Sequence, residues 1–163
     1  MDEFLRLHYA EAAPPIRRFL DLLCDNAREK GGDANCFAHA RDYAIDEAIG
    51  RAALAAMDEA AALAKSDAVR LRVEKASIWA LRAAVGDLPK RLSAGMRDQW
   101  NRGEITLDDF PTMKPDEIAE KGPHMRKLLV LCKKHGVDRW SEGWSLEQST
   151  PILQKFLAQV ASE

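Results

Sequence analysis

Two pairs of cysteine and histidine share a spacing that could bind a metal ion. Cys36 and His39 form one Cys-x-x-His pair, and Cys132 and His135 form the other. If the pairs converged, their four side chains could bind zinc in a tetrahedral site. Cys-x-x-His is not a usual zinc-finger spacing, however, and the two pairs lie in different sequence contexts. We therefore expect no metal and no cofactor, and we interpret Cys24, Cys36 and Cys132 as buried thiols that act as small hydrophobic residues.

A second candidate site lies in a short stretch with two tryptophans. It contains Arg139, Trp140, Glu142 and Trp144. Aromatic faces beside polar groups suit contact with a sugar or a partner protein, so these four residues are the candidates if the chain touches a substrate or a neighbouring domain. The alternative, which we favour, is that the tryptophans seal the core, because most large aromatic side chains in a small domain are buried.

No other set of residues matches a catalytic motif. The sequence has no nucleophile elbow and no papain-like cysteine context. Gly31 and Gly32 lead into neither of the common phosphate-binding motifs. Acidic pairs such as Asp108 and Asp109 are more typical of helix starts than of paired catalytic carboxylates. We therefore expect that this chain is not an enzyme and has no catalytic residue.

The charge and hydropathy of the chain restrict its partners. Lys plus Arg number 24 and Asp plus Glu number 26, which gives a net charge of -2. This balance provides no basic footprint for nucleic acid. No apolar run approaches the roughly 20 residues that span a bilayer. We expect neither nucleic acid nor a membrane as a partner, and the sequence does not indicate a compartment.

Residues 2–30 are predicted to be helical, with a bend. Pro14 and Pro15 interrupt the segment, and proline fits well in the first turn of a helix because its missing N–H needs no partner there. Ile16 and Phe19 then begin an apolar face at helical spacing. The segment therefore reads as two helices that meet at the prolines.

An alanine-rich helix is predicted over residues 46–65. Ala53, Met57 and Ala60 are part of its apolar stripe. A face of alanines lets a neighbouring helix approach closely, which indicates a central position. The same face could instead form a self-association surface, although packing within the molecule is the more common use of such a spacing.

A third long helix is predicted over residues 67–85. Ser66 and Asp67 are good residues for a helix start. The helix carries apolar residues on two sides, including Leu71 on one of them, so we expect it to be packed on both. Trp79 is accordingly expected in the core.

Shorter helices are predicted in the second half of the chain. Gly122-Pro123 is expected to end one of them, and Pro151 is expected to restart another. A short extended stretch is expected within residues 137–144. These pieces are less regular than the first three helices.

The predicted fold is all-α. It is an antiparallel helical bundle of three long helices, the first bent at proline, with shorter helices packed in the C-terminal half. Residues 1–163 are expected to form a single helical domain. A weak seam near residues 86–89 separates the bundle, 1–85, from the shorter helices, 90–163.

Two stretches resemble a known protein family. They read DEFLR with Tyr9 followed by AAPPIRRFLDLL near the N-terminus, and KHGVDRWSEG followed by SLE from Lys134 onward. Both are similar to the C-terminal helical region of a bacterial family of unknown function whose members look like alpha-glucuronidase-type glycoside hydrolases. The stretch His8-Tyr9-Ala10-Glu11 departs from the tyrosine-rich, glycine-bearing first motif of that family, so no role is carried over to these positions.

The resemblance implies a function for the chain. Members of such a family would carry a catalytic (β/α)8 barrel before this region, and their catalytic carboxylates would lie on the barrel. The chain is then expected to be a non-catalytic accessory module of a larger carbohydrate-processing enzyme that packs against the barrel or walls its cleft. Its partners would be the catalytic domain of the same parent chain and carbohydrate. The alternative is a free-standing helical domain for protein–protein interaction or self-association.

Overall fold

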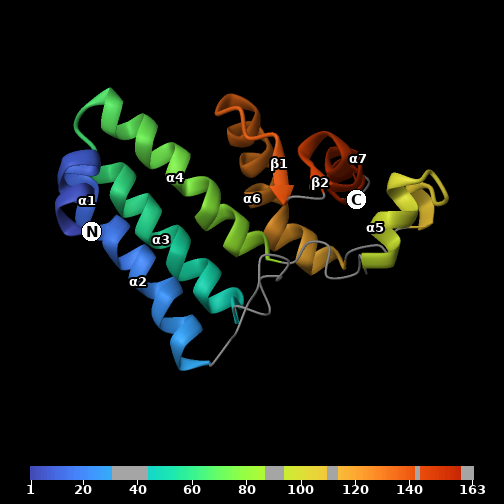
Figure 1. Ribbon diagram of the computed structural model, residues 1–163, viewed down its shortest axis with the longest axis horizontal. Coiled ribbons are helices and arrows are strands. Elements are labelled where there is room, and N and C mark those ends of the chain that lie inside the picture. Colours follow the sequence, from blue (N-terminus) through green and yellow to red (C-terminus); the bar gives the residue numbers. More distant parts are fainter. Residues whose placement is uncertain (31–43, 87–93, 110–113, 142–143, 159–163) are drawn as a thin grey trace. The chain divides into compact units, whose positions relative to one another are not determined.

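The computed structural model describes residues 1–30, 44–86, 94–109, 114–141 and 144–158. These residues are mostly helical, as predicted, and two short strands lie near the C-terminal end (Figure 1). The chain divides into two compact units, Met1–Gly86 and Asp87–Glu163, here called unit 1 and unit 2. Each unit has its own set of packed helices.

Unit 1 is built from helices that are consecutive in the chain (Figure 1). Its elements are α1 (Asp2–Tyr9), the 3-10 turn η1 (Ala10–Ala12), α2 (Ala13–Glu29), α3 (Glu47–Leu63) and α4 (Asp67–Val85). Helix α3 lies between α2 and α4 and packs against both. The amide of Asn26, late in α2, donates to the carbonyl of Ala44, just before α3, at 2.9 Å. Arg18, early in α2, pairs with Glu59, late in α3, so these two helices are antiparallel.

The bend in the first helical segment lies at η1, directly before the prolines. Pro14 and Pro15 occupy the first turn of α2, the position where their missing N–H groups leave no partner unsatisfied. Ala10 has a φ of 46°, a value that residues with a side chain rarely adopt. Glu11 accepts a hydrogen bond from the backbone N–H of Lys65, which ties the bend to the residues that follow α3.

Side chains cap the starts of the next two helices. Oδ1 of Asp46 accepts from the backbone N–H of Ile49 at 3.0 Å, at the start of α3. Oγ of Ser66 accepts from the backbone N–H of Val69 at 3.2 Å, at the start of α4. Each cap satisfies a backbone donor that has no partner inside the helix. The helix start predicted at Ser66 is thus confirmed.

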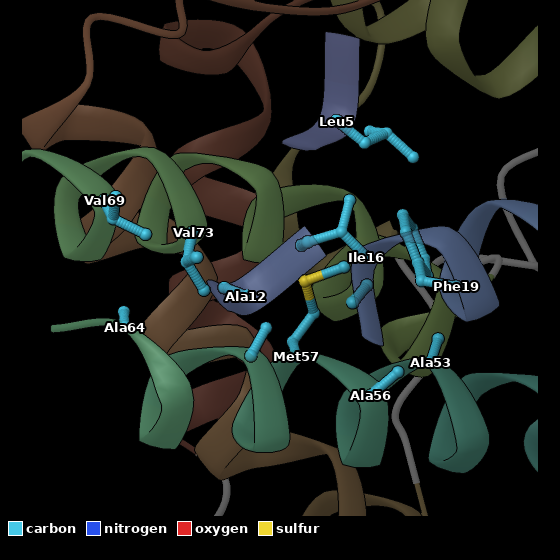
Figure 2. Packing of buried hydrophobic residues seen from close by; sticks show 12 residues of the cluster. Leu5, Ala12, Ile16, Phe19, Ala53, Ala56, Met57, Ala64, Val69 and Val73 are labelled. Atoms are coloured by element: carbon cyan, nitrogen blue, oxygen red, sulfur yellow. The ribbon is translucent and has the colours of Figure 1, made fainter. Parts of the chain in front are cut away.

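The core of unit 1 is filled by side chains from all four of its α-helices. Figure 2 shows Leu5, Ile16, Phe19 and Met57 converging between α1, α2 and α3. The buried cluster consists of Leu5, Ala12, Ile16, Phe19, Ala53, Ala56, Met57, Ala60, Ala64, Val69, Val73 and Ala80. Half of these residues are alanines, so the helices meet at short range rather than across layers of large side chains.

The alanine-rich helix α3 packs within the molecule. Ala53, Ala56 and Ala60 are buried in the cluster and are therefore not exposed for self-association. Gly50, in the first turns of α3, lies against the last turn of α4. A Cβ added to Gly50 would lie 2.7 Å from the Cα of Ala84, which is closer than real Cβ atoms approach. Only glycine fits at this contact, where the two backbones touch.

Unit 2 combines helices with a small hairpin. Its elements are α5 (Ala94–Asn101), η3 (Leu107–Asp109), α6 (Pro115–Lys134), β1 (Arg139–Ser141), β2 (Trp144–Ser145) and α7 (Leu146–Ala158). The prediction that its helices are all shorter than those of the bundle is wrong, because α6 has 20 residues and α4 has 19. Helix α6 packs against α7, with Leu157 of α7 lying over Gly122 of α6. Nζ of Lys155 on α7 donates to the carbonyl of Leu107 in η3. The buried residues of α6 and α7 include Ile118, Met125, Leu128, Leu131, Cys132, Ile152 and Leu153.

Two breaks predicted in unit 2 are wrong. Helix α6 continues through Gly122-Pro123, and α7 begins at Leu146 and runs through Pro151 instead of restarting there. Pro123 is exposed, and the carbonyl that it cannot bond belongs to Ala119, which is also exposed. Water can bind that carbonyl, so the missing N–H does not end the helix. The helix continues through Pro123 because the proline lies on its exposed side.

Candidate functional site

The tryptophan-rich segment forms a β-hairpin. Strands β1 and β2 pair antiparallel, with Arg139 opposite Ser145 and Ser141 opposite Trp144, and the register shifts between these pairs. The short extended stretch predicted within residues 137–144 is therefore present. The hairpin holds the backbones of Trp140 and Trp144 in adjacent strands. Arg139 is exposed.

Part of this predicted site lies outside the described residues. Glu142 is among the residues that the structure does not describe, and the side chains of Trp140 and Trp144 are likewise outside it. Whether these tryptophans seal the core or face solvent therefore stays a prediction.

The predicted pairs of zinc ligands are only half described. Cys36 and His39 lie outside the described residues. Cys132 is fully buried in α6, and His135 follows as the C-cap residue of that helix. Among the residues that the structure does describe, no group of three or more His, Cys, Asp or Glu side chains could hold a metal ion. Cys24 is exposed on α2, so the prediction that it is buried is wrong, whereas Cys132 fits it.

Trp79 is exposed, which contradicts the prediction that it belongs to the core. The exposed fraction of Trp79 is 70%. The buried residues of α4 fall in two rows: Val69, Val73 and Ala80 in the core of unit 1, and Ile78, Leu81 and Val85 on another side. At about 3.6 residues per turn, Trp79 falls outside both rows. The sequence signal for this was available, because Lys75 and Arg82 stand one turn before and one turn after it.

Trp79 belongs to a row of apolar and basic side chains along α4, all of them exposed except one half-buried arginine, Arg82. We call this row the α4 strip, and it consists of Leu71, Arg72, Lys75, Trp79 and Arg82. Lys75, Trp79 and Arg82 recur at spacings of four and three residues, which puts them on one face. Leu71 lies one turn before Lys75 and is 53% exposed, so its predicted packing is also wrong.

The α4 strip is basic. Three of its five side chains are cations. Asp67 stands one turn before Leu71, at the start of the strip, and the half-buried Glu74 follows Leu71 by three residues. Oδ1 of Asp67 accepts a hydrogen bond from Nη1 of Arg70 at 2.7 Å. Nη1 of Arg72 donates to the backbone carbonyl of His8 at 2.8 Å, which fixes this guanidinium where α4 meets α1.

A second exposed apolar row lies on α1, the helix that contacts α4. Phe4 and Leu7 are one turn apart and are 58% and 67% exposed. The ring of His8 stacks on Phe4 with 5.1 Å between centroids, so His8 supports the orientation of that ring. Burial raises the pKa of the neighbouring Tyr9, and the positive charge of Arg72 acts in the opposite direction. Two adjacent helices of unit 1 thus expose large apolar side chains beside cations.

Comparison with known proteins adds no relative. No family model, curated protein or solved structure matches the chain. The resemblance to alpha-glucuronidase-type proteins therefore stays a prediction. Within the described part of the chain, no helix has both the length and the apolar character needed to cross a membrane.

Proposed function

We propose that the chain is a non-catalytic helical module that binds another protein through the α4 strip. The observation that carries this proposal is the 70% exposure of Trp79 on a helix whose neighbouring positions are Leu71, Lys75 and Arg82. Tryptophan and arginine are the residues most enriched at the energetic centres of protein interfaces. Burying the exposed part of one tryptophan would contribute roughly 3 kcal/mol to binding.

The surrounding structure favours a docking role for this surface. Helix α4 is anchored to α3 by the close contact at Gly50, and to α1 by the hydrogen bond from Arg72 to His8. Its exposed face is therefore presented by a supported helix, and little ordering entropy is lost when a partner binds. Phe4 and Leu7 on α1 provide a second apolar row for a large partner surface.

The proposal is tested by placing a photo-cross-linking amino acid at single positions of the chain in its source cells. Position 79 should yield a covalent adduct with a protein of defined mass, and position 70, on another face of the same helix, should not. Equal adduct formation at both positions, or none at position 79, would show that the α4 strip is not the binding face. Trp79→Ala should change the free energy of unfolding by less than about 0.5 kcal/mol, because its side chain is exposed.

A second candidate function is the accessory module of a larger carbohydrate-processing enzyme. Its support is the β1–β2 hairpin, which holds the backbones of Trp140 and Trp144 in adjacent strands beside Arg139, together with the resemblance described above. In this proposal Arg139, Trp140, Glu142 and Trp144 contact a catalytic domain of the same parent chain, or its carbohydrate substrate.

Alanine variants of Trp140 and Trp144 test the second candidate. In the parent enzyme they should weaken either docking of this module, measured by limited proteolysis, or turnover of polysaccharide. Trp79→Ala in the same enzyme is the control. If docking and turnover of the hairpin variants equal those of this control, the hairpin has no such role. That outcome would leave the first proposal as the only one.

A further inference from the structure

The α4 strip has a length and a spacing that suit one partner helix. Leu71 and Trp79 are eight residues apart, or roughly 12 Å along α4 at about 1.5 Å per residue. Arg82 extends the strip by almost another turn. A helix that lies along this face would present its own apolar side chains about two turns apart, in contact with Leu71 and Trp79.

The charges of the α4 strip select the kind of helix that fits. Lys75 lies midway between Leu71 and Trp79, Arg72 and Arg82 lie beside them, and Asp67, one turn before Leu71, is paired with Arg70. Carboxylates on the partner helix would pair with these cations beside and between the apolar contacts, whereas lysines would be repelled. Arg72 keeps donors available there, because a guanidinium carries five N–H groups and its bond to the His8 carbonyl uses Nη1.

Two other classes of anionic partner fit the molecule less well. Nucleic acid and anionic membranes attract proteins through extended basic fields. This chain has a net charge of -2, and three of the four cations on α4 lie within one short strip. A local basic strip around a tryptophan is instead the size of a helix-binding face.

We propose that the α4 strip binds an acidic amphipathic helix of a partner protein, with Leu71 and Trp79 contacting its apolar face and Arg72, Lys75 and Arg82 contacting its carboxylates. This inference rests on the proposed function, that of a protein-binding module, and adds the chemistry of the partner.

The test uses three displayed libraries of 18-residue helix-forming peptides against the full chain. Each library randomises the apolar face among Leu, Ile, Met and Phe, and the flanking positions are Glu, Gln or Lys. Affinities of selected peptides are measured by fluorescence anisotropy at low and at moderate salt. The variants are Trp79→Ala, Lys75→Glu and, as a matched control on another face of the same helix, Arg70→Glu. Circular dichroism shows whether each variant remains folded.

The expected result is selective binding of Glu-flanked peptides that weakens with salt. Trp79→Ala should weaken this binding at least about tenfold, the size expected for the loss of an interface hot spot. Lys75→Glu should weaken the binding of Glu-flanked peptides and strengthen the binding of Lys-flanked peptides. Arg70→Glu should change the affinity for either by no more than about twofold.

Each other outcome overturns a defined part of the proposal. If Gln-flanked peptides bind as tightly as Glu-flanked ones and both depend on Trp79, a protein-binding face remains but the acidic partner is wrong. If no peptide depends on Trp79, the inference is wrong whatever becomes of the cross-linking test. Trp79-dependent binding to phosphatidylserine vesicles or to oligo-dT, in place of peptides, would assign the strip to a membrane or to nucleic acid. Trp79-dependent dimerisation in sedimentation velocity would assign it to a second copy of the chain.

Discussion

Helix α3 in unit 1 and helix α6 in unit 2 each contain a buried glycine, but the two glycines face different neighbours. Gly50 lies against the backbone of α4, where an added Cβ would be 2.7 Å from the Cα of Ala84. An added Cβ on Gly122 would meet the end of the Leu157 side chain at 3.7 Å, an ordinary contact. The same residue type is thus required for packing in one unit and replaceable in the other. Whether alanine can replace the glycine depends on the atoms that face it, backbone at Gly50 and a side chain at Gly122, because both glycines lie inside a helix.

The two units also differ in the residues at their positive-φ positions. In unit 2 the described residues with positive φ are glycines, Gly103 and Gly136. In unit 1 they include two alanines, Ala10 with φ 46° and Ala44 with φ 55°. A side chain in this region of φ costs free energy that glycine does not. Unit 1 therefore holds backbone strain where unit 2 holds none at the positions described.

The largest effects should come from the two buried methionines, which test whether each unit depends on its own core. Met57→Ala and Met125→Ala should each lower the free energy of unfolding by about 2–5 kcal/mol, because each leaves a cavity. Urea unfolding measures the size of the effect. Hydrogen exchange should accelerate in α2–α4 for the first variant and in α6–α7 for the second. Val130→Ala, at a 64% exposed position of α6, is the control, and a Met57→Ala effect as small as this control would contradict the packing described.

The glycine pair provides a sharper test because the expected changes have opposite signs. Gly50→Ala should lower the free energy of unfolding by about 1–3 kcal/mol, since the new Cβ forces α3 away from α4. Gly122→Ala should raise it by about 0.5–1 kcal/mol, since alanine is the better helix former and has room. Thermal unfolding of both variants measures the contrast. Two stabilised variants would mean that α3 and α4 do not touch at Gly50.

A smaller contrast is expected at two positive-φ positions, Ala10 in unit 1 and Gly136 in unit 2. Here the unit 1 variant should be the more stable one, and the unit 2 variant the less stable one. Ala10→Gly should stabilise unit 1 by about 1 kcal/mol, because glycine adopts this φ without strain. Gly136→Ala, after α6, should destabilise unit 2 by a similar amount, because its φ is 64°. Urea unfolding of each variant, under the same conditions as the parent protein, measures both changes in the free energy of unfolding. A destabilised Ala10→Gly variant would show that the turn before α2 is not strained.

The smallest effects should be on the response to acid, through one capping carboxylate in each unit. The N–H of Ile49 and then Lys30 hold the pKa of Asp46 below its usual value, and the N–H and hydroxyl of Thr106 do the same for Asp109. Because each folded-state pKa is below that of the unfolded chain, each contribution is present above the unfolded pKa of about 4 and is lost as pH falls through the folded value. Asp46→Asn and Asp109→Asn should each flatten the dependence of stability on pH below about 4. If the free energy of unfolding of a variant depends on pH as that of the parent protein does, the carboxylate that it replaces does not contribute to acid sensitivity.

Local sequence signals predicted the helices of unit 1 well, and predicted the unbroken course of α6 and α7 and the burial of single side chains poorly. The cap at Ser66, the prolines in the first turn of α2 and the extended stretch before α7 all depend on neighbouring residues, so they could be predicted. The break at Gly122-Pro123 was wrong because the cost of a proline depends on whether water reaches the carbonyl one turn earlier. Cys24 was wrong because residue type alone does not fix burial.

The sequence by itself determined a mostly helical chain and the starts of its main helices. The tertiary structure alone decided which sides of α4 are covered. The apolar spacing of α4 indicates several possible buried faces, and the packing of α1 and α3 against it selected the faces with Val69, Val73 and Ala80. Trp79 was left exposed because burial depends on residues distant in the chain, which local periodicity cannot specify.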